Sequence, residues 1–171
     1  MKPNHIRAIA ICLFRHGNQL LVAEGYDEVK RQTFYRPLGG TIEFGEYSHQ
    51  TIVREIREEL GAEVDHVTYL FTLENVFTHN GQPGHEIIMI YDGAFTDETL
   101  YRRERLEASE DNGQPFVARW MTLDAFARVA RDARAAGEAS GQSGDPPLYP
   151  TGLLERLTAS PFQEKSDLET Q

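Results

Sequence analysis

The sequence predicts an α+β fold built around a mixed β-sheet. Its β-rich and helical segments lack the regular β-α-β alternation that doubly wound folds require. The 171 residues include 40% hydrophobic and 26% charged residues, which is enough apolar material for one core. We expect a single domain over residues 1–158, with a flexible Gly-, Ser- and Pro-rich connector at about 137–147. The polar tail at 159–171 is expected to be disordered.

The N-terminal part is expected to begin with a β-hairpin. Residues 6–14 are apolar and suit a buried strand, and residues 19–24 suit a second strand after a turn. The polar stretch 25–36 is expected to be a loop, and residues 41–44 a short strand. The hairpin should therefore end before the Pro-Leu-Gly-Gly break that follows.

The strongest helix signal runs from Ser48, a plausible N-cap, to Gly61, a residue type that commonly follows a helix end. Its apolar residues recur on one face at helical spacing: Ile52, Val53, Ile56 and Leu60. The remaining elements are expected in this order: strand 64–77, loop 80–84, strand 86–95, strand 116–121, helix 123–136 and a short helical segment at 153–157.

Charge and composition exclude several classes of function. The formal net charge of −10 argues against a nucleic-acid backbone or an anionic membrane surface as partner. No apolar stretch approaches the length of a membrane span. The single cysteine, Cys12, lies in an apolar run and is expected to be buried and inert. These features predict a cytoplasmic protein.

Three glutamates of this helix raise a question, because like charges at helical spacing repel each other. At about 100° per residue, with Glu55 at zero, Glu59 lies at about 40° and Glu58 at about −60°. The three carboxylates thus form one row, and this row adjoins the apolar face. A solvated acidic face is the alternative, but carboxylates beside a buried face are best relieved by Mg²⁺ or Mn²⁺.

The spacing around this helix resembles the Nudix box of the Nudix hydrolases. From Gly40 it reads Gly, five residues, Glu46, seven residues, Arg-Glu-Ile, one residue, Glu-Glu, one residue, Gly-Ala. The one departure is Ala62, where the family has a larger aliphatic residue. Weaker resemblance extends from about residue 6 to residue 136. It implies an α/β/α sandwich and hydrolysis of a diphosphate linkage in a nucleoside diphosphate derivative, with Mg²⁺ as the usual cofactor and Mn²⁺ as a substitute.

The resemblance also implies roles for single residues. Glu55, Glu58 and Glu59 match the metal-binding glutamates of the family, and the carbonyl of Gly39 would be a further ligand. Arg54 matches the arginine that orients a neighbouring glutamate. Two supporting positions are matched by the box glycine Gly40 and by the upstream Glu46, which fixes the loop.

The general base and the substrate contacts are less constrained. Within the box the base candidate is Glu55. Outside it, Glu86 lies where a loop becomes an apolar strand, although a solvated strand-edge charge is an equal alternative. Arg36 leads into the metal loop and suits phosphate, and Tyr35 could stack on a base. Alternatively, Arg36 is an ordinary surface arginine and Tyr35 is part of the core.

Subfamily markers of Nudix hydrolases are mostly absent, so the substrate is expected only at the level of a nucleotide or nucleoside diphosphate derivative. The alternative function is a nucleotide-sensing Nudix module without catalysis, but such sensors commonly lose box carboxylates. An isomerase on the same fold would need an additional cysteine and metal-binding histidines. The family also implies a homodimer as one assembly, although nothing in the chain identifies an interface.

Overall fold

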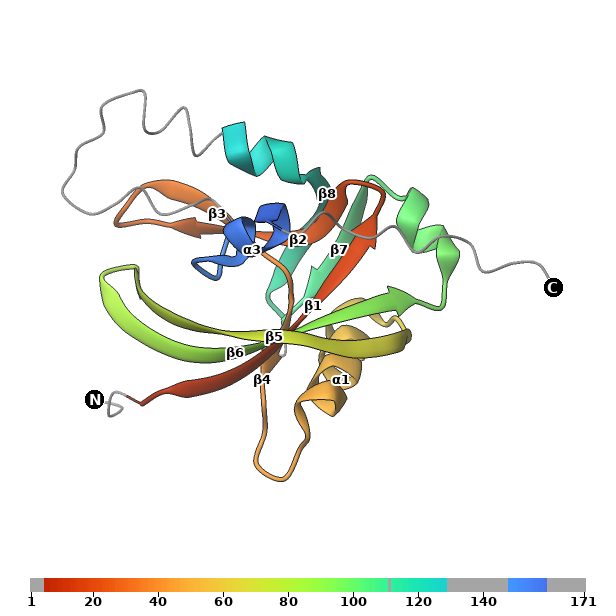
Figure 1. The fold of residues 1–171 in the computed structure, drawn as a ribbon, viewed down its shortest axis with the longest axis horizontal. Coiled ribbons are helices and arrows are strands. Elements are labelled where there is room, and N and C mark those ends of the chain that lie inside the picture. Colours follow the sequence, from red (N-terminus) through yellow and green to blue (C-terminus); the bar gives the residue numbers. More distant parts are fainter. Residues whose placement is uncertain (1–4, 111, 129–147, 160–171) are drawn as a thin grey trace.

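The computed structural model describes residues 5–110, 112–128 and 148–159. Strands form one mixed sheet in the order β5-β6-β1-β2-β8-β7, with β3 beside β2 and β4 beside β1 (Figure 1). The strand bounds are β1 Arg7–His16, β2 Gln19–Asp27, β3 Gln32–Arg36, β4 Leu38–Thr41, β5 Val64–His79, β6 Gln82–Phe95, β7 Arg105–Ser109 and β8 Pro115–Thr122. The helices are α1 Ser48–Leu60, the 3₁₀-helix η1 Glu98–Arg102 and α3 Leu153–Ala159, and residues 123–128 are also helical.

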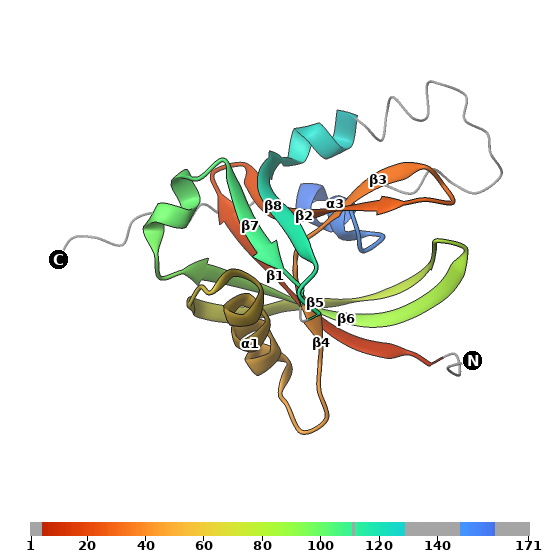
Figure 2. The same ribbon diagram turned by 180° about the vertical axis from the view of Figure 1, so that it is seen from behind.

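Helices cover both faces of this sheet, which confirms the predicted α+β sandwich. One core cluster lies under α1, whose Ile52 and Ile56 are fully buried. The other lies on the opposite face under α3 and the helical residues 123–128, which contribute Leu153 and Phe126. Figures 1 and 2 show α1 on one side of β1, and α3 on the other. Among the described residues, no helix has the length and apolarity needed to cross a bilayer.

The central strand β1 connects the two parts of the sheet. From Arg7 to Phe14 it pairs with β6 in parallel, and from Ile9 to Cys12 it also pairs with β4 in antiparallel orientation. Its last two residues, Arg15 and His16, pair with β2. The predicted opening hairpin is confirmed. The prediction of a loop at 25–36 is wrong, because β2 continues to Asp27 and β3 pairs with it. This part of the two strands extends beyond the core. Its sequence is polar and lacks the alternation of apolar and polar residues that would indicate a strand.

The predicted start of α1 was wrong by one residue. Tyr47 is the N-cap, and its backbone N–H donates to the Gln50 side chain at 2.9 Å, so that Ser48 is the first helical residue. Gly61 ends the helix in the left-handed conformation with φ 64°, as predicted. The short strand expected at 41–44 lies earlier, as β4, where Gly39 and Gly40 pair with β1.

The remaining elements agree with prediction to different degrees. β5, β6 and β8 are confirmed, but the predicted loop at 80–84 shrinks to a turn at Asn80 and Gly81. The short helix at 153–157 is confirmed and runs to Ala159. η1 and the edge strand β7 were not predicted, although Leu106 and Ala108 alternate with exposed residues in β7. The helix predicted at 123–136 is confirmed to residue 128. Its remainder, the connector at 137–147 and the tail after residue 159 lie outside the described residues.

Candidate active site

Helix α1 buries two carboxylates on the same face as its apolar side chains. Glu55 and Glu59 are only 7% and 6% exposed, beside the buried Ile52 and Ile56. Buried carboxylates are rare unless they are paired or bind metal. The side chain of Glu58, by contrast, is 45% exposed. Burial therefore divides the predicted row: Glu55 and Glu59 are buried, whereas Glu58 lies at the exposed edge.

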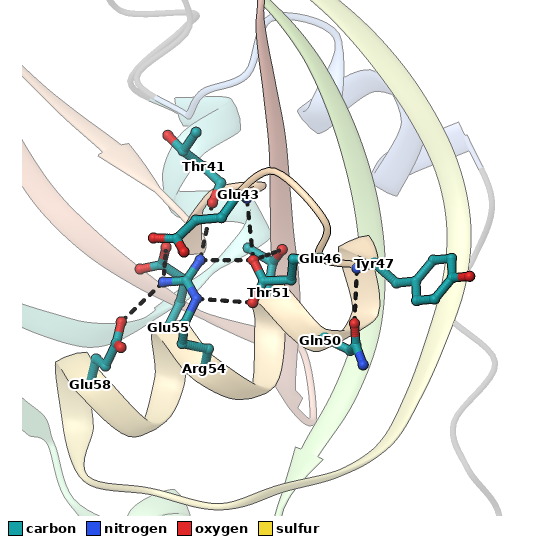
Figure 3. Close-up of polar contacts among 9 residues, drawn as sticks. All are labelled: Thr41, Glu43, Glu46, Tyr47, Gln50, Thr51, Arg54, Glu55 and Glu58. Carbon is teal, nitrogen blue, oxygen red and sulfur yellow. Dashed lines mark hydrogen bonds and ion pairs between the residues drawn. The ribbon is translucent and has the colours of Figure 1, made fainter.

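Arg54 connects the acidic residues around the start of this helix (Figure 3). Its Nε and Nη2 atoms donate to both oxygens of Glu46 at 2.9 and 3.0 Å. Its Nη1 donates to Glu55 at 2.9 Å and to Glu58 at 3.0 Å. Its Nη2 also donates to the carbonyl of Thr41 at 3.1 Å. Arg54 thus fixes the orientation of Glu55 and ties the loop before α1 to the helix.

The Arg54 guanidinium lowers the pKa of Glu46 from 4.5 to about 2, although burial acts in the opposite direction. The hydroxyl of Thr51, at 2.8 Å, and the N–H of Glu43 also donate to this carboxylate and favour its charged form. Glu46 in turn raises the pKa of Arg54. Glu46 is therefore a structural anion that holds the loop onto the helix.

We expect this ion pair to make stability depend on pH in the acid range. Because the folded-state pKa of Glu46 lies below its unfolded value, the stabilisation is complete above about pH 5 and is lost as pH falls toward 2. Because solvent partly screens this surface ion pair, we expect it to contribute about 1–2 kcal/mol. Urea unfolding of the wild type and of Glu46→Gln should differ by this free energy at pH 7 and by little near pH 2. A difference in unfolding free energy that does not change with pH would show that the ion pair of Glu46 with Arg54 is not its source.

Two glycines let strand β4 approach β1 and α1 closely. A Cβ atom on Gly39, which has φ 138°, would lie 2.2 Å from the carbonyl oxygen of Ala10. A Cβ on Gly40 would lie 2.2 Å from Oε1 of Glu55. The space that a side chain at Gly40 would need is thus occupied by the Glu55 carboxylate. This contact explains physically why glycine is required at the first position of the box.

Gly40→Ala should therefore displace the Glu55 carboxylate. With the roles that the Nudix resemblance implies, we expect kcat/KM on a nucleotide substrate to fall about a hundredfold, as for the loss of a group that orients a metal ligand. Steady-state kinetics at several Mg²⁺ concentrations would measure this change. Gly17→Ala is the control, since its Cβ meets nothing within 4 Å although its φ of 57° adds strain. Equal kinetics for wild type and Gly40→Ala would show that the position of Glu55 is not critical.

The two buried carboxylates line a cavity of about 280 Å³, here called the carboxylate cavity. Gly39, Gly40, Glu55 and Glu59 line it together with Glu86 from β6. The side chain of Glu86 is only 12% exposed. The parallel pairing of β1 with β6 places Arg7 beside Glu86, and their side chains form an ion pair. Asn75 Nδ2 lies 3.5 Å from the other Glu86 oxygen.

A second cavity, of about 600 Å³, adjoins the first and is here called the aromatic cavity. Its lining includes the rings of Phe34, Phe77, Phe116 and Tyr149. Both cavities are lined by six residues: Arg7, Arg36, Asn75, Glu86, Glu110 and Tyr149. The two spaces therefore meet around Glu86, so that one extended ligand could reach from the buried carboxylates to the aromatic rings.

The tips of two hairpins meet beside the aromatic cavity. Asp27, which lines it and is 3% exposed, accepts the N–H of Lys30 at 2.7 Å and that of Asn80 at 3.0 Å. Burial raises the pKa of Asp27, but these two donors, together with the charges of Lys30 and His79, lower the pKa overall. The backbone N–H of Glu28 also donates to the Asn80 side chain at 2.7 Å. These bonds hold the β2–β3 hairpin against the β5–β6 hairpin.

The structure separates the two residues predicted to contact substrate. Arg36 lines both cavities and pairs with Glu110 at 3.0 Å. Tyr35 is absent from the described lining of both cavities, and its ring packs 5.8 Å from that of Phe126 on the α3 face. Successive residues of a strand point to opposite faces, so the neighbouring Phe34 lines the aromatic cavity instead.

Sequence reasoning missed Asn75 and Tyr149 as cavity residues. Asn75 is 3% exposed. Its neighbours in the strand face outward, which is only a weak indication in the sequence that the polar residue between them is buried. Tyr149 lies far from the box in sequence and gave no local signal. Arg7, which lines both cavities, was not singled out from the sequence either.

The residues at the carboxylate cavity match a divalent cation in their chemistry. Carboxylate and carbonyl oxygens from Glu55, Glu59, Glu86 and Gly39 are the hard ligands that Mg²⁺ and Mn²⁺ prefer. Among the described residues, no group of three or more Asp, Glu, His or Cys side chains is already arranged to hold a metal ion. Glu55 and Glu58 instead accept hydrogen bonds from Arg54.

Comparison with known proteins supports the same interpretation. The chain is similar to the solution structure of the E. coli ORF135 protein, with TM-score 0.55 and 20% identity, over 98% of this chain and 99% of that one. It is also similar to a MutT NUDIX hydrolase from Burkholderia pseudomallei, with TM-score 0.53 and 18% identity, over 71% and 86%. At these identities the likeness shows the fold. A family model described as the NUDIX domain, however, matches residues 3–140. The chain therefore belongs to the Nudix hydrolase family, whose members generally hydrolyse nucleoside diphosphate derivatives.

Proposed function

We propose that the protein hydrolyses a diphosphate linkage in a nucleoside diphosphate derivative and depends on Mg²⁺, for which Mn²⁺ can substitute. The observation that carries this proposal is the meeting of two cavities around Glu86. One cavity holds the buried carboxylates of α1, and the other is lined by aromatic rings. A nucleotide has matching parts, namely a charged diphosphate and an aromatic base.

Electrostatics explains why a cation is needed in this proposal. A diphosphate would approach three carboxylates, Glu55, Glu59 and Glu86, in a protein of net charge −10, and this approach is repulsive. Glu55, Glu59 and the Gly39 carbonyl would hold the ion, with Glu58 at the exposed edge. When bound, the ion supplies positive charge at the phosphoryl oxygens and lowers the pKa of a coordinated water.

The protein's own residues then perform the remaining steps. Arg36 contacts phosphate oxygens, because a guanidinium fork matches their geometry. Arg7 exchanges its contact with Glu86 for a substrate phosphate, which leaves the Glu86 carboxylate able to accept a proton. Water adds to phosphorus, its proton passes to Glu86, and the bridging oxygen leaves with its electron pair. Arg54 keeps Glu55 oriented toward the cavity, and Glu55 remains the alternative base.

A panel of nucleoside triphosphates, dinucleoside polyphosphates and nucleoside diphosphate sugars tests the proposal. We expect turnover of at least one of them in Mg²⁺, with products separated by chromatography. Leading examples are a nucleoside triphosphate and a dinucleotide. Tight binding of a nucleotide without turnover would instead support the alternative, a Nudix module that senses nucleotides. A homodimer, a cytoplasmic location and the absence of nucleic-acid partners also remain predictions.

A further inference from the structure

The C-terminal segment forms one wall of the candidate site. Tyr149 and Pro150 line the carboxylate cavity, and Tyr149 also lines the aromatic cavity. Both residues lie beyond residues 3–140, over which the family model matches. This wall therefore comes from a part of the chain that the family resemblance does not describe.

The wall is held in place from several sides. The backbone N–H of Tyr149 donates to the carbonyl of Tyr35 at 2.8 Å, and the N–H of Thr151 donates to Oδ1 of Asn75 at 3.3 Å. Leu148 and Leu153, on either side, are fully buried on the α3 face of the sheet. The segment is thus anchored to β3, to β5 and to the core, so that its position at the cavities is defined.

Tyr149 has a particular place within the wall. Among the six residues that line both cavities, it is the aromatic one. Its ring packs edge-on against Phe34, with 5.5 Å between centroids and 84° between ring planes. The ring of Phe34 in turn lies against Gly25, where an added Cβ would be 2.3 Å away. The Phe34 ring therefore supports the Tyr149 ring at the junction of the two cavities.

We propose that Tyr149 is a specificity-determining residue that contacts the sugar of the bound nucleotide. This inference rests on the proposed function, in which the diphosphate lies near Glu55 and Glu59 and the base lies in the aromatic cavity. The group that joins these two parts must then pass the junction, and in a nucleotide that group is the sugar. A fixed aromatic ring offers apolar contact area to the C–H groups of a sugar at low entropic cost.

Calorimetric titration in Mg²⁺ with two probes tests this role directly. The first probe is a set of nucleoside monophosphates of adenosine, guanosine, cytidine and uridine, and the second is inorganic pyrophosphate. Tyr149→Ala should raise the Kd of the nucleoside monophosphate that binds best about tenfold and leave the Kd of pyrophosphate unchanged. Tyr149→Phe keeps the ring and should stay within about threefold of the wild type. On the best panel substrate, Tyr149→Ala should raise KM more than it lowers kcat.

The control is Glu155→Gln, on the exposed side of α3 in the same segment, which should change neither Kd. If Tyr149→Ala fails to fold, Tyr149→Leu keeps the apolar bulk without the ring and should still weaken nucleoside monophosphate binding. An unchanged nucleoside monophosphate Kd would overturn the inference, and so would an equal loss for both probes. Nucleotide binding without any turnover would overturn the proposed function alone, whereas neither binding nor turnover would overturn both.

Discussion

Replacing Glu59 by Gln is expected to lower kcat/KM on the best nucleotide substrate by about a thousandfold. Glu59 is 6% exposed and lines the carboxylate cavity beside Glu55. In our account it is a ligand of the cation, and the amide of glutamine is a neutral and weaker ligand. Loss of the ion removes several kcal/mol of charge stabilisation at phosphorus, and about 4 kcal/mol corresponds to a thousandfold. Steady-state kinetics at saturating and limiting Mg²⁺ would separate weaker metal binding from slower chemistry.

The matched control for this substitution is Glu63→Gln. Glu63 lies just beyond α1, pairs with Arg57 at 2.8 Å and has a side chain that is 56% exposed. The same chemical change outside the cavity should leave kcat/KM within about twofold of the wild-type value, since exposed ion pairs contribute little to stability. Full turnover by Glu59→Gln would show that Glu59 is not a metal ligand. Thermal unfolding of both variants would reveal whether a loss of activity reflects a loss of fold.

Replacing Glu86 by Gln is expected to lower kcat by about two to four orders of magnitude, the usual contribution of a general base. Glu86 is nearly buried at the junction of the two cavities, where Arg7 and Asn75 contact both of its oxygens. Glutamine keeps the shape and the contact with Asn75 but cannot accept the proton of an attacking water. KM should therefore change much less than kcat, as expected for an interaction that matters mainly in the transition state.

Glu74→Gln is the control for this second substitution. Glu74 lies on the neighbouring strand β5, pairs with His85 at 2.8 Å and has a side chain that is 65% exposed. It is absent from the described lining of both cavities. We expect its variant to retain wild-type kcat. An unchanged kcat in Glu86→Gln would leave Glu55 as the remaining candidate for the base.

Local spacing was sufficient to predict much of the fold and of the candidate site. The helix around Glu55 was readable because Ile52 and Ile56 recur at helical spacing, and Gly61 ends it in the conformation that glycine favours. The resemblance to the Nudix box also implied that Arg54 contacts a neighbouring glutamate, and Arg54 donates to Glu55 at 2.9 Å. The expected row of three carboxylates was too wide, because Glu58, at about −60° on the wheel, lies on the side away from the apolar residues and stays exposed.

Features that depend on long-range pairing were not predictable from one sequence. β3 lies in a polar stretch and exists because β2 pairs with it outside the core. The prediction that Tyr35 contacts substrate does not fit its position on the α3 face of the sheet. The sequence did not show which residues of β3 point to which face. Tyr149 reaches the cavities only because Leu148 and Leu153 anchor its segment, some 90 residues after the box. Glu86 lines the cavity from within β6 rather than from the expected loop-to-strand boundary, and its pairing with Arg7 depends on the parallel β1–β6 register.

The most direct test of the central claim is a Mg²⁺ titration of turnover on the best panel substrate, starting from protein stripped with EDTA. We expect no measurable hydrolysis in EDTA and a saturable recovery as Mg²⁺ is added, because the carboxylates of Glu55 and Glu59 repel the diphosphate when no ion is bound. Mn²⁺ should restore turnover as well. Hydrolysis that proceeds equally well in EDTA would show that the protein does not need a divalent cation.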